Sequence, residues 1–204
     1  MRLLRSLMPL VLGSGSPRRR QLLTALGLDF HVEPAAVEEN RRDGEAAGAF
    51  VCRMAAAKAV EVGRRNRGCW VLAADTIVVG ADGVPFGKPV DGVDARRMLS
   101  ALDGCWHTVS TAYVLRRDGG HEVVVPRVDH ARVRLDFPDA AHIEAYIATG
   151  EPMDKAGSYA VQGIGAAFVT GIDGAPLTVV GLPLHLLVPD LTRCGIAVLA
   201  GGTG

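Results

Sequence analysis

A small-residue turn followed by three arginines is the part of this sequence best suited to holding an anion. The segment LGSGSPRRRQLL, residues 12–23, ends a short apolar run and starts a helical pattern at Pro17. The first N–H groups of a helix have no partner inside it, and the helix dipole favours negative charge there. Arg18 and Arg19 stand in the first turn, where a bound phosphate would offset their repulsion with that dipole. An ordinary capped helix with solvated arginines explains the segment equally well, and the Walker A spacing is absent.

Two charged residues occupy positions that favour acid–base chemistry. Asp75 lies inside VLAADTIVV, where a carboxylate must be hydrogen-bonded in the core or face a cleft from the end of a strand. Lys88 follows in FGKP, between a glycine and a proline. A shared cavity and a structural ion pair both account for these two residues. Glu38 and Glu39 are adjacent in a polar loop, a setting typical of solvated surface charges.

A glycine-rich stretch, GEPMDKAGSYAVQGIG at residues 150–165, has the composition of a tightly shaped loop that lines a site. The amide of Gln162 could hydrogen-bond the edge of a nucleotide base, or it could cap a turn. His107 begins a predicted strand, and a lone histidine is more typical of a structural residue than of a base or a ligand. The histidines and the four cysteines form no ligand cluster, so neither zinc nor a disulfide framework is predicted and buried thiols are expected.

The composition excludes several classes of protein. The 204 residues are 49% hydrophobic, enough for a real core, and 22 basic residues balance 22 acidic ones. The chain therefore lacks the basic surplus of a non-specific nucleic-acid binder. Residues 1–12 imitate a secretory signal, but Arg5 and Pro9 interrupt the apolar run and no cleavage site follows. The sequence thus predicts a cytoplasmic protein with neither a nucleic-acid nor a membrane partner.

Helical and strand patterns are mixed along the whole chain, which predicts an α/β fold. The expected strands are 9–14, 29–37, 69–80, 165–172 and a hairpin of 107–117 and 121–128 around a DGG turn. The expected helices are 17–26, 44–65, 91–104, 138–150 and 181–191.

Six ordered blocks together resemble the Maf family of nucleoside triphosphate pyrophosphatases. LGSGSPRRRQLL is similar to that family's L-A-S-x-S-P-R-R-x-x-L-L motif, AADTIVV to its A-D-T-x-V strand and FGKP to its G-K-P. MLSALDGCWHTVSTAYVL is similar to its M-L-x-x-L-s-G-x-x-H-x-V-x-T segment, and GEPMDKAGSYAVQG and VVGLPL match its last two blocks. The resemblance runs from about Leu10 to Leu187. It implies a Maf/inosine-triphosphatase-like fold, a twisted mixed central sheet flanked by helices, with two lobes around a cleft.

The resemblance also implies one domain over residues 1–204, with a core of about 10–190, and it favours a homodimer. The tail AGGTG, residues 200–204, is expected to be frayed from its composition. It assigns the phosphates to Ser14, Ser16, Arg18 and Arg19, with Lys58 as a further substrate contact. The catalytic set that it implies is Glu39, Asp75 and Lys88, with Asp75 as the proton acceptor.

Substrate preference within the family follows three positions. Members with S-P-R, A-D-T and Y-g-x-Q-G act on dTTP and UTP, whereas members with S-P-W, S-D-Q and a Glu in place of that Gln prefer 7-methyl-GTP. This chain has Arg18, Thr76 and Gln162, all of the first kind. It departs from the family at Gly13, usually Ala, and at 175–178, where many members carry a Tyr and an Asn. The second departure bears on the local loop and on base selectivity.

The implied reaction is attack of water on the α-phosphorus of a nucleoside triphosphate, which yields the monophosphate and pyrophosphate. Mg²⁺ or Mn²⁺, held by Glu39, Asp75 and phosphate oxygens, would polarise the phosphate and lower the pKa of the water. Asp75 would then take the proton. One alternative is the same enzyme acting on another base, either 7-methyl-GTP or a modified or damaged pyrimidine nucleotide. Another is a nucleotide-binding regulator of cell division without turnover.

Overall fold

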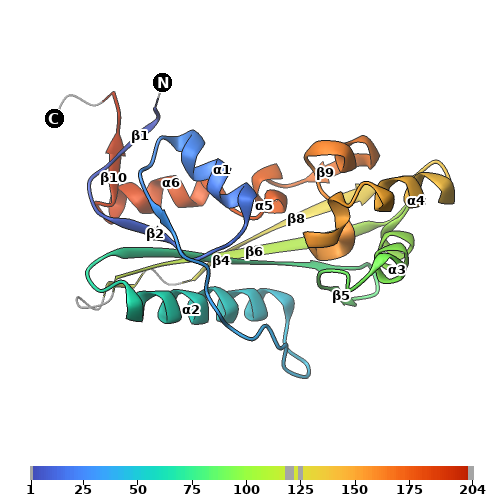
Figure 1. Ribbon diagram of the computed structural model, residues 1–204, viewed down its shortest axis with the longest axis horizontal. Helices are drawn as coiled ribbons and strands as arrows, with labels where there is room; N and C mark the ends of the chain where they lie inside the picture. Colours follow the sequence, from blue (N-terminus) through green and yellow to red (C-terminus); the bar gives the residue numbers. More distant parts are fainter. Residues whose placement is uncertain (1, 118–121, 124–125, 202–204) are drawn as a thin grey trace. The chain divides into compact units, whose positions relative to one another are not determined.

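Three long strands form the centre of the sheet: β4 (Trp70–Val79), β6 (Trp106–Arg117) and β8 (Arg127–Leu135). The computed structural model describes residues 2–117, 122–123 and 126–201. In these residues the sheet has the order β3-β2-β4-β6-β8-β9, with β5 paired to β4 and β7 to β6. The chain forms two units, and each of the three long strands contributes residues to both. The mixed sheet with its helices (Figure 1) confirms the predicted α/β class.

The first unit comprises Met1–Asp75, Ala112–Val128 and Gly181–Gly204. Its strand β2 (Leu10–Leu12) pairs in parallel with β3 (His31–Val32) and with β4. Helices α1 (Pro17–Leu26) and α6 (Leu184–Arg193) lie on one side of these strands and α2 (Ala47–Arg65) on the other (Figure 1). A separate antiparallel pair joins β1 (Leu4–Ser6) to β10 (Ala197–Leu199). The core of this unit includes Leu12, Leu23, Leu72, Leu187 and Leu191.

Helix α1 begins and ends where its sequence predicts. Pro17 takes the first helical position, where its missing N–H costs nothing. Gly27 ends the helix in the left-handed conformation, with its N–H on the Thr24 carbonyl and that of Leu28 on the Leu23 carbonyl. This pairing satisfies carbonyls that the end of a helix would otherwise leave open.

The second unit comprises Thr76–Thr111 and Asp129–Val180. It contains β5 (Pro85–Phe86), β9 (Val169–Asp173) and the helices α3 (Gly92–Leu102), α4 (Ala140–Ala148) and α5 (Pro176–Val180). Three short 3₁₀ turns separate α4 from β9: η1 (Glu151–Asp154), η2 (Ala156–Ser158) and η3 (Gly163–Phe168). Its core includes Met98, Leu99, Val133, Phe137 and Tyr146.

Several sequence predictions need correction. The predicted strand at 165–172 starts only at Val169, because the preceding residues form η3. The predicted strand at 29–37 is reduced to the two residues of β3. The hairpin is confirmed by the antiparallel pairing of β6 with β7 (Glu122–Val123), while its DGG turn lies outside the described residues, as does most of the tail. The expectation of four buried thiols is wrong, because Cys105 is exposed and the other three are half-buried.

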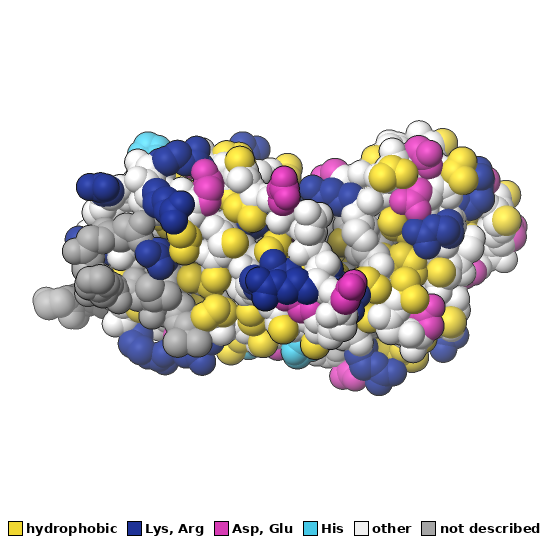
Figure 2. All heavy atoms as spheres, turned by 90° about the horizontal axis from the view of Figure 1, so that it is seen from below, with side chains coloured by type: hydrophobic (Ala, Val, Ile, Leu, Met, Phe, Trp, Pro, Cys, Tyr) yellow, Lys and Arg dark blue, Asp and Glu magenta, His cyan; other side chains and the backbone are white. Residues whose placement is uncertain are grey.

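The surface carries charges of both signs. Basic and acidic side chains are both present on the face seen in Figure 2, in keeping with the equal numbers in the sequence. None of the helices that the structure describes is long and apolar enough to cross a membrane.

Candidate active site

Two hydrogen bonds hold the turn that precedes α1, one to the Ser14 hydroxyl and one to the backbone of β4. The N–H of Gly13 donates to the Leu72 carbonyl at 2.8 Å, which ties the turn to β4. Ser16 is the N-cap residue, but its side chain makes no capping bond within the described part of the chain. Its N–H instead donates to the Ser14 hydroxyl at 3.3 Å. A Cβ at position 13 would come within 3.3 Å of a Val62 methyl, so glycine suits this tight packing.

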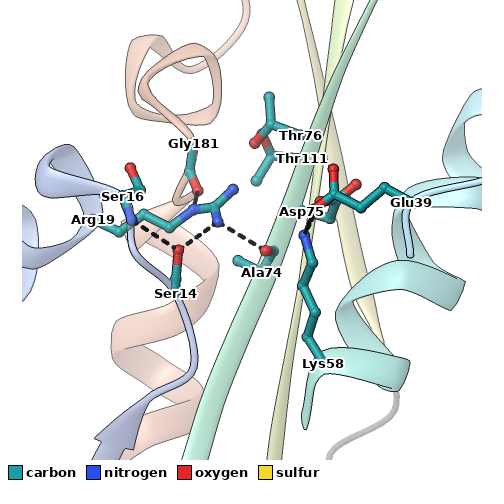
Figure 3. A network of polar contacts seen from close by, with 10 residues as sticks. All are labelled: Ser14, Ser16, Arg19, Glu39, Lys58, Ala74, Asp75, Thr76, Thr111 and Gly181. Atoms are coloured by element: carbon teal, nitrogen blue, oxygen red, sulfur yellow. Dashed lines mark hydrogen bonds and ion pairs between the residues drawn. The ribbon is translucent and has the colours of Figure 1, made fainter. Parts of the chain in front are cut away.

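Arg19 ties the turn to two other segments of the first unit. Its guanidinium donates to the Ser14 hydroxyl at 2.9 Å, the Ala74 carbonyl at 2.8 Å and the Gly181 carbonyl at 2.8 Å (Figure 3). The side chain is 8% exposed, and this burial lowers the pKa of Arg19, an effect that nearby Asp75 opposes. Charge-assisted bonds of this kind are among the stronger ones in proteins. Arg19 therefore links the Ser14 hydroxyl to the middle of β4 and to the segment that begins at Gly181.

Two carboxylates share one ammonium group. Lys58 Nζ lies 2.6 Å from Asp75 Oδ1 and 2.5 Å from Glu39 Oε1 (Figure 3). Asp75 and Lys58 are buried, whereas the Glu39 side chain is 54% exposed. The Glu39 side chain is therefore not merely a solvated surface charge, which corrects the interpretation of its loop taken alone.

The position of Lys58 follows from the pattern of α2. Val51, Ala55 and Val62 are buried at helical spacing, and Lys58 lies on the same stripe. Its ammonium thus enters the interior at β4, where Asp75 interrupts an otherwise apolar strand. A lysine on a buried stripe requires a partner, because an unpaired buried charge is strongly unfavourable.

The electrostatics of Asp75 result from opposing effects. Burial raises the pKa of the Asp75 carboxyl, and the nearby Glu39 carboxylate adds to this rise. The charge and hydrogen bond of Lys58 act in the opposite direction. A buried carboxylate with such competing perturbations is a common feature of catalytic sites.

Three of the predicted site residues, Thr76, Lys88 and Gln162, lie in the second unit. Thr76 is half-buried, and its Oγ1 lies 2.8 Å from that of Thr111. Lys88 is exposed in the loop between β5 and α3. Gln162 is exposed at the N-cap of η3, yet its amide makes no capping bond to the described residues. The alternative that Gln162 caps a turn through its side chain is therefore not supported.

Two other polar residues of the sequence analysis have structural roles. The Glu151 carboxylate accepts from the N–H groups of Ile164 at 3.0 Å and Gly165 at 2.8 Å, which shapes the loop that carries Gln162. His107 is buried, and its Nε2 lies 2.8 Å from the Tyr159 hydroxyl. Burial lowers the pKa of His107 to about 4, so its imidazole is neutral at pH 7. These features are consistent with the structural interpretation of this histidine.

The sequence matches the family described as Maf-like protein over residues 9–194. The chain belongs to the Maf family. Curated relatives of this Maf protein carry the name dTTP/UTP pyrophosphatase. The relative from Anaeromyxobacter sp. (strain Fw109-5) is 48% identical over 91% of this chain and 89% of its own. The relative from Oleidesulfovibrio alaskensis is 46% identical, over 95% of this chain and 88% of its own. The relative from Geobacter metallireducens is also 46% identical, over 91% of this chain and 96% of its own. The solved structure of a HAM1 protein from Coxiella burnetii aligns with a TM-score of 0.42 at 16% identity, over 63% of this chain and 73% of that chain.

The departure of this Maf protein at residues 175–178 has a physical account. The segment forms the short helix α5, which begins at Pro176. Thr178 is completely buried, and its hydroxyl donates to an Asp129 carboxylate oxygen. A buried threonine with a satisfied hydroxyl therefore occupies the place where many family members carry Asn. The sequence analysis missed this helix and the polar contacts of Thr111 and Thr178.

The donor set of the first unit suits a hard divalent cation. Asp75 and Glu39 supply carboxylate oxygens, and both contact the ammonium of Lys58. No cluster of three or more His, Cys, Asp or Glu side chains occurs among the described residues. Mg²⁺ is typically bound by one or two carboxylates together with substrate phosphates, so two protein ligands are sufficient.

Proposed function

We propose that this protein hydrolyses dTTP and UTP to the nucleoside monophosphate and pyrophosphate. The observation that carries the proposal is the buried Asp75 carboxylate, which lies beside Lys58 and Glu39 in the first unit. The names of the curated relatives support the same reaction and the same substrates. Arg18, Thr76 and Gln162, of the dTTP and UTP type, are the proposed determinants of base preference.

In the proposed mechanism, Asp75 accepts the proton of the attacking water. A bond forms between the water oxygen and the α-phosphorus, and the bond from the α-phosphorus to the bridging oxygen breaks. The leaving pyrophosphate takes that electron pair. Lys58 orients Asp75 through their 2.6 Å contact, and its charge opposes the rise in the pKa of Asp75 that burial causes. General-base catalysis of this kind contributes on the order of 10²- to 10⁴-fold in rate.

The remaining residues would stabilise charge and hold the metal. Arg18, Arg19 and Lys88 are proposed to neutralise the triphosphate, with N–H groups of the turn at Ser14 and Ser16 as further donors. Glu39 and Asp75 would hold Mg²⁺ or Mn²⁺, which polarises the α-phosphate when bound. Glu39 reaches this position from a largely exposed loop, so it can contact both solvent and a ligand.

The test is release of pyrophosphate by the wild type and by Asp75→Asn. The panel of substrates is dTTP, UTP, CTP, 7-methyl-GTP and ITP, with Mg²⁺ or Mn²⁺ and with EDTA as a control. We expect metal-dependent turnover led by dTTP and UTP, and at least about a 100-fold fall in kcat for Asp75→Asn with nucleotide binding retained. Glu38→Gln, which removes an exposed carboxylate next to Glu39, serves as the matched control and should retain turnover.

Each other outcome has a definite meaning. Unchanged kcat in Asp75→Asn removes this residue from the mechanism. Turnover led by 7-methyl-GTP contradicts the assigned base preference. Tight binding of nucleotide without turnover indicates a regulatory protein rather than an enzyme.

A further inference from the structure

The loop that carries Glu39 is anchored on α2 by an arginine–glutamate pair. Residues 33–46 connect β3 to α2 and contain neither a helix nor a strand. Arg53 of α2 donates to both carboxylate oxygens of Glu45, from Nε at 2.7 Å and from Nη2 at 2.6 Å. The same Nη2 donates to the carbonyl of Asn40, the residue directly after Glu39, at 3.0 Å. One guanidinium in the first unit therefore holds this loop at two points.

The glutamate of this pair also organises the loop internally. Glu45 Oε2 accepts the N–H of Arg42 at 3.1 Å, and the Glu45 carbonyl accepts from Arg41 Nε at 2.8 Å. The Glu45 side chain is 10% exposed, whereas the other residues of 38–46 are exposed. Because this segment offers no large apolar side chain, hydrophobic packing cannot order it, and the polar anchor does so instead. The hydrogen bonds from Arg53 lower the pKa of Glu45 to about 2, so the pair stays ionised at neutral pH.

The arginine is itself held in place, on the same helix as Lys58. The guanidinium carbon of Arg53 lies 5.5 Å from the centre of the buried Phe50 ring. Farther along α2, Lys58 Nζ lies 2.5 Å from Glu39 Oε1 (Figure 3). Helix α2 thus fixes Glu39 twice, through its side chain and through the carbonyl of the next residue.

We propose that Arg53 is a positioning residue that holds the loop of residues 38–46 so that the Glu39 carboxylate is placed to bind the divalent cation. This inference rests on the proposed function, in which Glu39 and Asp75 hold Mg²⁺ or Mn²⁺. The Glu39 side chain is 54% exposed, and on an unanchored loop its ordering would cost conformational entropy each time a cation binds. The bonds of Arg53 to Glu45 and Asn40 reduce that cost before the cation arrives.

The test compares Mn²⁺ binding by the wild type and by Arg53→Met, which keeps a long side chain but removes all three bonds. The EPR signal of free Mn²⁺ gives the dissociation constant of the metal-free protein without nucleotide. We expect this constant to rise about tenfold in Arg53→Met, because residues that orient a metal ligand typically affect affinity by this much or more. The Mn²⁺ concentration for half-maximal turnover of dTTP should rise in parallel, while kcat at saturating Mn²⁺ stays within about twofold of the wild type.

A double-mutant cycle separates positioning of Glu39 from a general structural role. Glu39→Gln removes the charged ligand, so Arg53→Met should change the Mn²⁺ dissociation constant by less than about twofold in that background. A tenfold effect that persists in Glu39→Gln overturns the inference, because Arg53 then acts through something other than Glu39. An unchanged constant in Arg53→Met also overturns it.

Arg96→Met is the matched control for loss of an arginine–glutamate pair. Arg96 on α3 donates through two nitrogens to the Glu144 carboxylate on α4, in the second unit. An equal weakening of Mn²⁺ binding in Arg96→Met contradicts a specific role for Arg53. Should Arg53→Met fail to fold, Glu45→Ala decides in the same way, because it removes the other half of the pair. A wild type that binds Mn²⁺ but releases no pyrophosphate refutes the proposed function instead.

Discussion

Two buried basic side chains, those of Arg19 and Lys58, hold the polar groups around them in place. Arg19 and Lys58 both reach into the first unit, and each contacts groups from separate segments of the sequence. Lys58 partly compensates the desolvation of Asp75, which would otherwise favour the neutral acid. The charge of Lys58 thus favours the ionised form of Asp75, the form that can accept a proton.

Removal of the Lys58 charge should therefore raise the pKa of Asp75. In Lys58→Met the attraction that lowers this pKa is lost, while burial and Glu39 continue to raise it. The carboxyl then takes up its proton at a higher pH than in the wild type. The measurement is a ¹³C NMR titration of the Asp75 carboxyl in metal-free protein. Lys58→Arg retains the charge and should restore most of the wild-type value, and a pKa that stays constant in Lys58→Met contradicts the assignment.

At the scale of elements, positive φ and close packing coincide at the end of α1. Gly27 has φ +86°, and a Cβ there would lie 2.6 Å from Arg2 Cβ. Gly27→Ala should lower the free energy of unfolding by about 1 kcal/mol because of the left-handed backbone conformation. The contact with Arg2 should lower it further.

Gly68 provides the matched control for this substitution. Its φ is +83°, yet nothing lies within 4 Å of the position that a Cβ would take. Gly68→Ala should therefore lower the free energy of unfolding by the backbone cost alone. Urea denaturation of both variants gives the comparison, and an equal loss in the two would show that Arg2 moves aside without cost.

Elements with strong local signals could be predicted from the sequence. Pro17 and Gly27 mark the ends of α1, and Asp91 and Asp139 cap α3 and α4. Strand β8 was missed, although Ala131, Val133 and Leu135 alternate as buried residues with exposed or half-buried arginines. That alternation was the available signal. Strands β1 and β10 have three residues each, and their pairing joins opposite ends of the chain, so no local pattern could have revealed them.

At the scale of the whole molecule, the stability should depend on pH through His107. Its pKa is about 4 in the fold, against about 6.5 in an unfolded chain. Between pH 4 and 6.5 the unfolded chain binds more protons at this histidine than the folded protein does. The contribution of neutral His107 to the free energy of unfolding is therefore complete above about pH 6.5 and is lost as the pH falls toward 4. The full loss is on the order of 3 kcal/mol.

Urea denaturation between pH 4 and 7 checks this expectation. His107→Gln retains a polar partner for Tyr159 but cannot titrate, so its free energy of unfolding should fall less steeply toward acid than that of the wild type. Identical slopes for the two proteins would assign the acid sensitivity to carboxylates elsewhere. The single-domain organisation and the homodimer remain predictions.

The sequence by itself determined the α/β class, the start of α1 at Pro17 and the family, because these depend on local periodicity and on ordered motifs. Only the tertiary structure decided which charges meet. Lys58 on α2 meets Asp75 on β4 and Glu39 in the loop before α2. Thr76, Thr111 and Thr178 come from three separate segments of the chain. The physical reason is that burial and hydrogen-bond direction arise from packing between distant segments, and a single sequence does not encode such contacts in any local pattern.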